Sequence, residues 1–247
     1  MAPFHQRSGR LTVPFAFART GKKGMDQLER HGAVGFAIVA ALFTLLMAAG
    51  RSPALAQTPS TLEFSVERNG AEIGSHRIRF TREGGRLTVD TDVSVRVAVA
   101  FVTVYRFTHR AHEVWEGDRL VALDAETDDD GEPHRLTVRA DGDGLRVTHN
   151  GVESRVPGGL IPTSLWNRAM TRQTTLLGTL RGDAMPTQVT ALGSSAVTAA
   201  GKEVAADGFL IDASPDYKRW VWYDAQGRLV AVSLEADDGS LVRYRLR

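Results

Sequence analysis

The chain has 247 residues, with 30 Lys and Arg, 29 Asp and Glu, and no cysteine. Residues 1–56 hold seven of the basic and two of the acidic residues, so residues 57–247 carry a formal charge of about −4. This balance excludes the basic surface on which nucleic-acid binding depends, and the missing cysteine excludes disulfides, thiol nucleophiles and a lipidated N-terminus.

The N-terminal segment has the parts of a secretory signal peptide. Residues 33–49, AVGFAIVAALFTLLMAA, form an uncharged apolar run of 17 residues that follows several basic side chains. Ala54 and Ala56 supply the small-x-small pattern of a cleavage site. We therefore expect residues 1–56 to be removed and the mature chain, from Gln57 on, to lie in the periplasm without a membrane span. A single transmembrane anchor is the alternative, but the run is at the short end for spanning a bilayer.

The start of the leader is unusual. The 24 residues before Met25 are long for the first part of a signal peptide, whereas a start at Met25 gives an ordinary length. We therefore expect Met25 to be the true start and residues 1–24 to be an extension of the gene prediction. Residues 57–247 are enough for one domain with its own core.

From residue 60 on, the period of the hydrophobic pattern is two. In RLTVDTDVSVRVAV, residues 86–99, one face holds Leu87, Val89, Thr91, Val93, Val95, Val97 and Val99, and the other face holds mostly charged or polar residues. Turn pairs such as Asn-Gly and Asp-Gly recur about every 8 to 16 residues. The pattern predicts an all-β fold: an antiparallel meander of about 11–13 strands that curls into a barrel or half-barrel.

The stretch YRFTHRAHEVWEGDRL, residues 105–120, looks at first like a metal or acid–base site. It lies within the β pattern, however, and His109 and His112 would then point to opposite sides of a strand and could not bind one metal. The alternation places one set of side chains on the inner face: Tyr105, Phe107, His109, Glu113 and Trp115. We expect no metal, no cofactor and no catalytic residue here.

A carboxylate on an inner face is costly unless it is paired, which leaves two interpretations of Glu113. In the first, Glu113 pairs with His109 or with an arginine of a neighbouring strand in a structural network. In the second, it is a polar anchor at the floor of a ligand cavity.

Only IPTSLWNRAMTRQ, residues 161–173, interrupts the β pattern. Pro162 followed by Thr163 or Ser164 as N-cap predicts one short helix at about 162–171, with Trp166 as the plug of the barrel. The acidic run at 124–134 lacks the spacing of a calcium loop and is expected to be a turn. The chain also lacks a G-x-S-x-G motif and a Walker loop.

Several segments resemble an uncharacterised family of exported proteobacterial proteins that carry a domain of unknown function. The segments are YRFTHRAHEVWEGDRLVALDAETDDDGE, SLWN, RQTTLLGTLRGD and WYDAQGRLVAV. The family's Y-R-[YF]-x-H-x-x-x-E-x-W strand is matched by Tyr105, Arg106, Phe107, His109, Glu113 and Trp115. A more distant likeness is to the periplasmic lipoprotein-carrier superfamily (LolA- and LolB-like). It implies a curved antiparallel sheet around an apolar cavity and no shared chemistry.

A meander with one apolar face must close or be covered, and one short helix covers only part of it. We therefore expect a periplasmic, non-enzymatic β-barrel or half-barrel that binds or carries a lipid or another apolar or amphipathic ligand. The alternative is a structural or assembly module that contacts another envelope protein. An enzyme of unrecognised type is the third possibility.

Overall fold

The computed structural model describes residues 60–214 and 217–247. The predicted signal peptide, residues 1–56, lies outside the described residues. In the part of the chain that is described, no helix is both long and apolar enough to cross a membrane.

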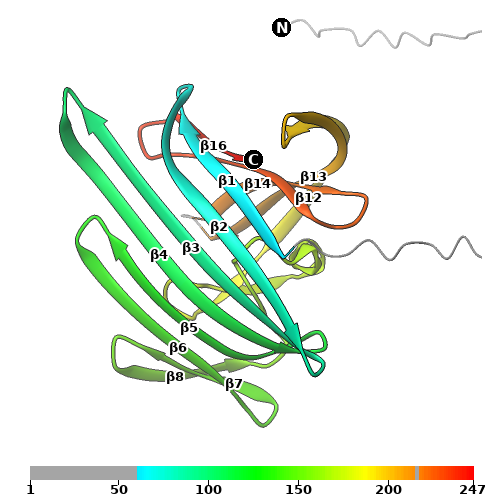
Figure 1. Ribbon diagram of the computed structural model, residues 1–247. Coiled ribbons are helices and arrows are strands. Elements are labelled where there is room, and N and C mark those ends of the chain that lie inside the picture. The colour runs from blue at the N-terminus through cyan, green and yellow to red at the C-terminus, as the bar shows by residue number, and fades with distance from the viewer. Residues whose placement is uncertain (1–59, 215–216) are drawn as a thin grey trace, which may run out of the picture. The chain divides into compact units, whose positions relative to one another are not determined.

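The fold is all-β and is dominated by one antiparallel sheet of 13 strands (Figure 1). Its strands follow one another in the order β12-β13-β14-β15-β16-β1-β2-β3-β4-β5-β6-β7-β8. The bounds are β1 Thr61–Arg68, β2 Ala71–Glu83, β3 Arg86–Val99, β4 Val102–Glu116, β5 Arg119–Asp129, β6 Glu132–Asp141, β7 Gly144–His149, β8 Val152–Pro157, β12 Gln188–Ala199, β13 Lys202–Ser214, β14 Tyr217–Asp224, β15 Leu229–Glu235 and β16 Leu241–Leu246. The predicted meander is confirmed.

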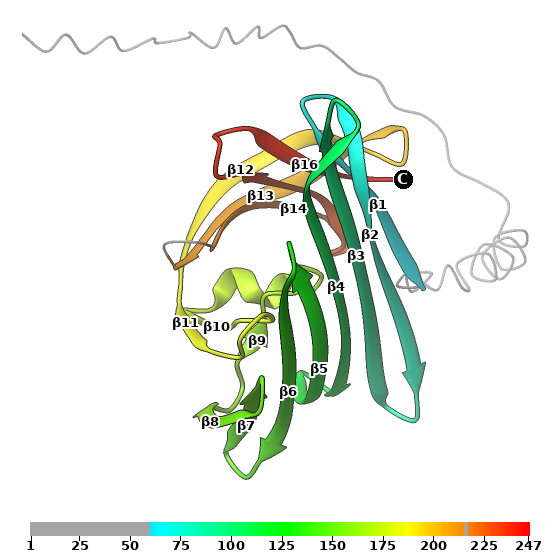
Figure 2. The ribbon, with the colours of Figure 1, turned by 90° about the vertical axis from the view of Figure 1, so that its left-hand side faces the viewer.

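The first and last strands of the domain pair with each other, with Phe64 opposite Leu246 and Val66 opposite Tyr244. The two halves of the meander therefore form one continuous, strongly curved sheet (Figure 2). Its outer strands, β8 and β12, are not hydrogen-bonded to each other, so the sheet does not close. Of the two predicted forms, barrel and half-barrel, the structure has the open one.

Burial follows the predicted alternation. On β3, Leu87, Val89, Thr91, Val93 and Val95 are buried, while the residues between them face outward. The hairpins also turn where the sequence predicts, because Asn or Gly takes the left-handed conformation there. Asn69 and Gly70, for example, have φ of 52° and 81°, and Asn150 and Gly151 have φ of 47° and 83°.

The concave face is filled by an inserted segment, residues 158–187, which we call the insert. It contains a three-stranded sheet in the order β11-β10-β9 and the 3₁₀ helix η1. The bounds are β9 Ile161–Pro162, η1 Arg168–Arg172, β10 Thr175–Leu177 and β11 Ala184–Pro186. Met170, Leu176 and Leu177 of the insert are fully buried in the main core.

The predicted helix at about 162–171 is wrong in type and place. Pro162 belongs to β9, and the helix that does form is a 3₁₀ helix beginning at Arg168, with Asn167 as its N-cap. Helical backbone is interrupted at Leu165, whose φ is 70°. The N–H of Trp166 donates to the carbonyl of Ser164 at 2.9 Å, which makes a γ-turn centred on Leu165.

Candidate functional site

A row of paired residues crosses the concave face from β1 to β6. Phe64 lies opposite His76, His76 opposite Val93, and Val93 opposite His109. The row continues through Thr127 to His134, on β5 and β6. Three histidines therefore point to the interior at regular intervals across the sheet.

Two of these histidines are held in the neutral form. Burial, together with the nearby His109, lowers the pKa of His76 from 6.5 to about 3. Burial also lowers the pKa of His109 to about 4, although Asp92 opposes the shift. The His109 Nδ1 lies 2.8 Å from the Thr127 hydroxyl. Both rings can therefore exchange hydrogen bonds with a neutral ligand at neutral pH.

His112 behaves differently, as the strand alternation predicts. It is exposed on the convex face, and its Nδ1 lies 2.7 Å from the Asp90 carboxylate. His109 and His112 therefore lie on opposite faces of β4. The described residues contain no group of three or more side chains that could hold a metal ion.

Glu113 is fully buried, and its partners are two tryptophans. The Trp115 indole N–H donates to Oε2 at 2.8 Å, and the Trp166 indole N–H donates to the same oxygen at 3.1 Å. Burial raises the pKa of Glu113, and donation by Ser164, Trp115 and Trp166 only partly opposes it. Glu113 is thus paired in a buried network, as one of the two interpretations expected, but its partners are the two tryptophans and not His109 or an arginine.

Trp166 precedes the helix and does not lie on it, which corrects its predicted position. It is half-buried, and its ring meets that of Trp115 edge-on with 5.5 Å between centroids. The ring of Phe80 also meets the Trp166 ring edge-on, with 5.6 Å between centroids. Trp166 therefore ties the insert to the wall of the sheet, whereas Met170 is the residue of η1 that fills the core.

A cavity of about 480 Å³ lies between the concave face and the insert. Its wall includes Tyr105, Phe107 and His109 of the predicted site. Glu113 and Trp115 lie in the packed core beside it, and Trp166 lines a different hollow, of about 530 Å³, near η1. The structure thus brings only part of the predicted set to one cavity.

The cavity is amphipathic and contains residues that the sequence did not single out as a site. Its apolar lining includes Val93, Phe107, Leu165, Leu180 and Met185. Its polar lining includes His76, Thr91, Thr163, Ser164, Tyr217 and Tyr244, together with the charged Asp129, Arg181, Asp183 and Arg219. Two buried polar atoms on the sheet side of this lining have no hydrogen-bond partner among the described residues: His76 Nε2 and Thr91 Oγ1. Thr91 lay on the predicted inner face of its strand, which is the signal that could have identified it.

Comparison with known proteins places the chain in a family. The family described as Domain of unknown function (DUF6134) matches residues 64–247. The chain belongs to this family. No curated protein matches the chain.

A solved structure from Brucella abortus, a beta-barrel-like protein of the domain of unknown function DUF1849, is similar to this family member. It is 14% identical, and the match covers 76% of this chain and 94% of that chain, with a TM-score of 0.55. At this identity the likeness shows a beta-barrel-like fold only. The predicted likeness to lipoprotein carriers stays a prediction.

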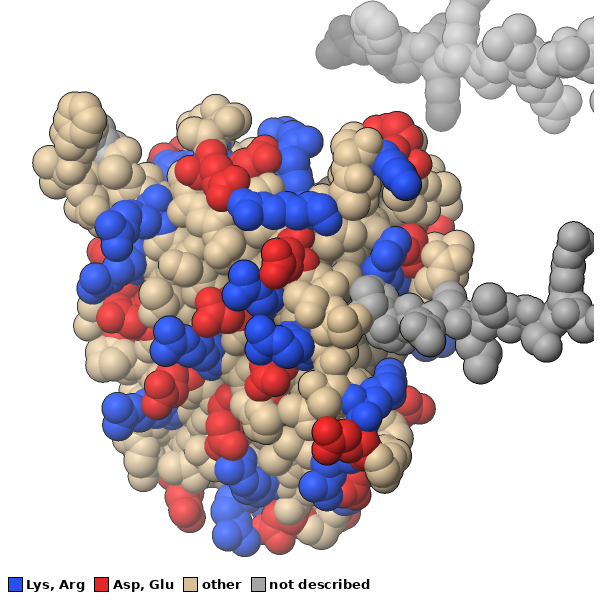
Figure 3. Space-filling model, viewed as in Figure 1, with Lys and Arg blue, Asp and Glu red and all other residues tan. Residues whose placement is uncertain are grey.

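The convex face of this family member is a lattice of paired charges (Figure 3). A shallow hollow of about 720 Å³ lies there. Its charged residues form pairs such as Arg110 with Asp92 and His112 with Asp90. Because these pairs are exposed, they contribute little to stability.

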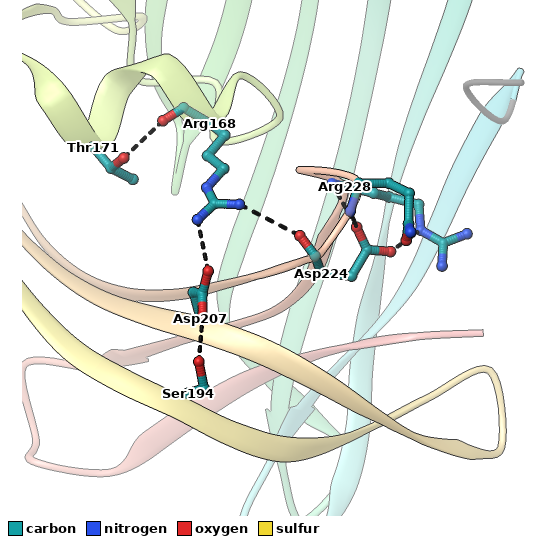
Figure 4. Close-up of polar contacts among 7 residues, drawn as sticks. Arg168, Thr171, Ser194, Asp207, Asp224 and Arg228 are labelled. Carbon is teal, nitrogen blue, oxygen red and sulfur yellow. Dashed lines mark hydrogen bonds and ion pairs between the residues drawn. The ribbon is translucent and has the colours of Figure 1, made fainter. Parts of the chain in front are cut away.

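A polar network fixes η1 to the other half of the sheet (Figure 4). The Arg168 guanidinium donates to Asp207 at 2.7 Å and reaches the carbonyl of Asp224 at 3.5 Å. Ser194 donates to the other oxygen of Asp207. The buried Asp224 accepts from Arg228 at 2.8 Å, so the hairpin that receives Arg168 is itself fixed, and η1 is anchored to β13 and β14.

Proposed function

We propose that the protein binds a small amphipathic ligand inside the curved sheet, without chemical conversion of that ligand. The observation that carries this proposal is the pair of buried polar atoms without a partner, on His76 and Thr91, both on the sheet side of one cavity. Buried polar groups are normally satisfied, and each unsatisfied one costs about 1–3 kcal/mol. A ligand that hydrogen-bonds to them recovers this cost.

The cavity also limits what the ligand is. A volume of about 480 Å³ suits one small organic molecule and not a bilayer-length lipid taken in whole. Phe107, Val93 and Leu180 offer an apolar side, while neutral imidazoles and hydroxyls offer donors and acceptors. The ligand would therefore carry hydroxyl or carbonyl groups on an apolar frame.

Thr91→Val is the sharpest test, because it removes one hydroxyl and keeps the shape of the side chain. We expect this variant to be as stable as the parent or slightly more stable, since an unpaired buried group is lost. We also expect it to retain less small molecule in native mass spectrometry of protein purified from the periplasm. Binding of the fluorescent amphipath anilinonaphthalene sulfonate should weaken in parallel.

Thr88→Val is the matched control, because Thr88 lies on the same strand but belongs to the outward set of residues. It should leave retention and dye binding unchanged. Equal retention by parent and Thr91→Val, or no retained molecule in any of the three proteins, would contradict the proposal.

The proposal includes export, which the apolar run and Ala54-Leu55-Ala56 support. N-terminal sequencing of the protein from a periplasmic extract should give Gln57 as the first residue. An intact leader in the inner membrane would mean that the apolar run is an anchor.

The second candidate function is assembly with another envelope protein through an edge of the sheet. Strand β12, Gln188–Ala199, is an edge strand of 12 residues with no charge and no proline. Exposed edge strands usually carry charged residues or proline, because these residues prevent the strand from pairing with another chain. Ser195→Pro should abolish a complex formed by strand addition and leave ligand retention intact, which separates the two functions.

A further inference from the structure

The hairpin between β3 and β4 extends beyond its neighbours in the sheet (Figure 1). Strand β2 pairs with β3 only as far as Val95, and β5 pairs with β4 only from Phe107 onward. Residues 97–105, VAVAFVTVY, therefore form a two-stranded ribbon that pairs with no third strand and has no charged side chain, although Val97 and Tyr105 at its base pack against the core. We call these residues the apolar ribbon.

The apolar ribbon exposes large apolar side chains at its tip. Phe101 is fully exposed, Val102 is 64% exposed and Val104 is 52% exposed. An isolated two-stranded ribbon is only marginally stable in water. A cluster of exposed apolar side chains on such a ribbon is stabilised when another apolar surface covers it.

The turn itself holds Phe101 outward. Ala100 and Phe101 have φ of 47° and 70°, a left-handed conformation that is unfavourable for residues with a side chain. Other hairpins of the main sheet have Gly at the second of these positions, as at Asn69-Gly70, Asp130-Gly131, Asn150-Gly151 and Ala200-Gly201. Here the residue at the tip is a large aromatic one, which is an unusual choice for a turn that meets only water.

The charges at the base of the ribbon indicate what it contacts. Arg96 and Arg106 lie opposite each other, are exposed, and flank the apolar ribbon on both strands. The Arg106 guanidinium lies 3.9 Å from Asp128, and its backbone N–H donates to Asp130, so acidic side chains of the β5–β6 turn lie beside Arg106, whereas Arg96 has no acidic partner among the described residues. In Figure 3 the uncharged projection at the upper left, formed by this tip, has basic side chains at its base. An apolar tip with arginines at its base fits a lipid surface, because the tip can enter the acyl region while the arginines contact the phosphates.

The size of the tip favours lipid over protein. A stable protein interface buries about 800 Å² on each partner, much more than the ends of a few side chains provide. Insertion into a membrane interface needs no such area, because each apolar side chain gains independently by leaving water.

We propose that the apolar ribbon docks the protein on a phospholipid surface, with Phe101 and Val102 among the acyl chains and Arg96 and Arg106 at the phosphates. Tyr105 belongs both to the ribbon and to the cavity wall. Docking would therefore bring the cavity close to the membrane, although the proposal does not depend on a ligand in that cavity.

The first experiment is flotation of the mature protein with vesicles of phosphatidylethanolamine and phosphatidylglycerol. The parent protein should float, and Val102→Asp should partition at least tenfold less. The matched control is Val152→Asp, at a valine that is 70% exposed on the β7–β8 hairpin and should have no effect. Arg96→Gln with Arg106→Gln should weaken binding and reduce its dependence on salt.

The second experiment uses the absence of cysteine from the chain. Phe101→Cys labelled with nitrobenzoxadiazole should become brighter and blue-shifted when vesicles are added, while the same label at Val152→Cys should not change. Thr91→Val should still float, which separates this test from that of ligand binding.

Three results would overturn the proposal. The parent protein could fail to float with the vesicles, or Val102→Asp and Val152→Asp could float equally well. Alternatively, the parent could form concentration-dependent dimers that Val102→Asp abolishes while no lipid is bound, and the ribbon would then be an interface between two copies.

Discussion

The wall of the cavity and the insert are built by different rules, although they share one core. In the wall, strands β2 to β6, side chains alternate between the inner and the outer face, so the position of a residue along its strand determines which face it is on. The insert has strands of two or three residues and a single 3₁₀ turn, so its conformation depends on contacts with the wall. Local pattern therefore determines the wall, and tertiary packing determines the insert.

Gly182 shows how closely the two parts fit. It has a φ of 75°, and a Cβ at this position would collide with Leu136 of the wall and with Val147 of the adjoining strand β7. On the other side, the Tyr223 hydroxyl donates to the carbonyl of Leu165 at 2.6 Å, next to the strained γ-turn. The insert is thus held by contacts from both halves of the sheet.

The two tryptophans that share Glu113 allow the most direct comparison, because one belongs to each part. Trp115 is 1% exposed, so Trp115→Ala should lower the free energy of unfolding by about 3–5 kcal/mol. Trp166 is half-buried, and Trp166→Ala should cost about 1.5–3 kcal/mol. Urea unfolding of both variants measures the difference, and an equal loss would mean that the insert is as tightly packed as the wall.

Replacement of Glu113 tests the contact between the parts directly. Glu113→Ala leaves two indole N–H groups without an acceptor and should cost about 2–4 kcal/mol. Glu113→Gln keeps an acceptor oxygen and should change stability by less than about 1 kcal/mol at neutral pH. If both variants lose the same stability, the carboxyl contributes through packing alone.

The difference in stability between the parent protein and Glu113→Gln should change with pH in one direction. Burial raises the pKa of Glu113 above its ordinary 4.5, so the folded protein keeps this proton to a higher pH than the unfolded chain. The stability that this proton contributes is full below pH 4.5 and is lost as pH rises through the folded pKa. Glu113→Gln should therefore gain stability relative to the parent as pH rises.

Prediction from the sequence succeeds where the alternation of apolar and polar residues determines which side chains are buried. It fails where contacts between distant segments determine the backbone conformation. The inner face of residues 105–115 was predictable because six alternating side chains leave only one arrangement. The helix at 162–171 was not, because Pro162 pairs with Leu177 in β9–β10 and the left-handed Leu165 interrupts the helical backbone. His76 was missed as a cavity residue because its role depends on His109, two strands away.

Protonation of the buried, neutral His76 should change the free energy of unfolding by less than the replacement of Trp115 does. His76 is protonated in the unfolded chain below its ordinary pKa of 6.5 but in the folded protein only near 3. Its contribution to stability is therefore present above pH 6.5 and is lost as pH falls toward 3. Between pH 7.5 and 5 the loss should be about 2 kcal/mol. His76→Asn should flatten the stability–pH curve by that amount, and a parallel curve would show that His76 is protonated in the folded state.

The smallest effect is expected at His112, the histidine that the sequence motif made most conspicuous. Its ring is exposed and its contact with Asp90 is a surface pair, so His112→Ala should change the free energy of unfolding by less than about 0.5 kcal/mol. His109→Ala, three residues earlier, should cost more, because it empties an inner position and leaves the Thr127 hydroxyl unpaired. Thermal and urea unfolding of the two variants, side by side, measure this asymmetry. Equal losses would contradict the alternation of β4, and with it the assignment of the cavity wall, since a helix or a shifted register would place both rings in similar surroundings.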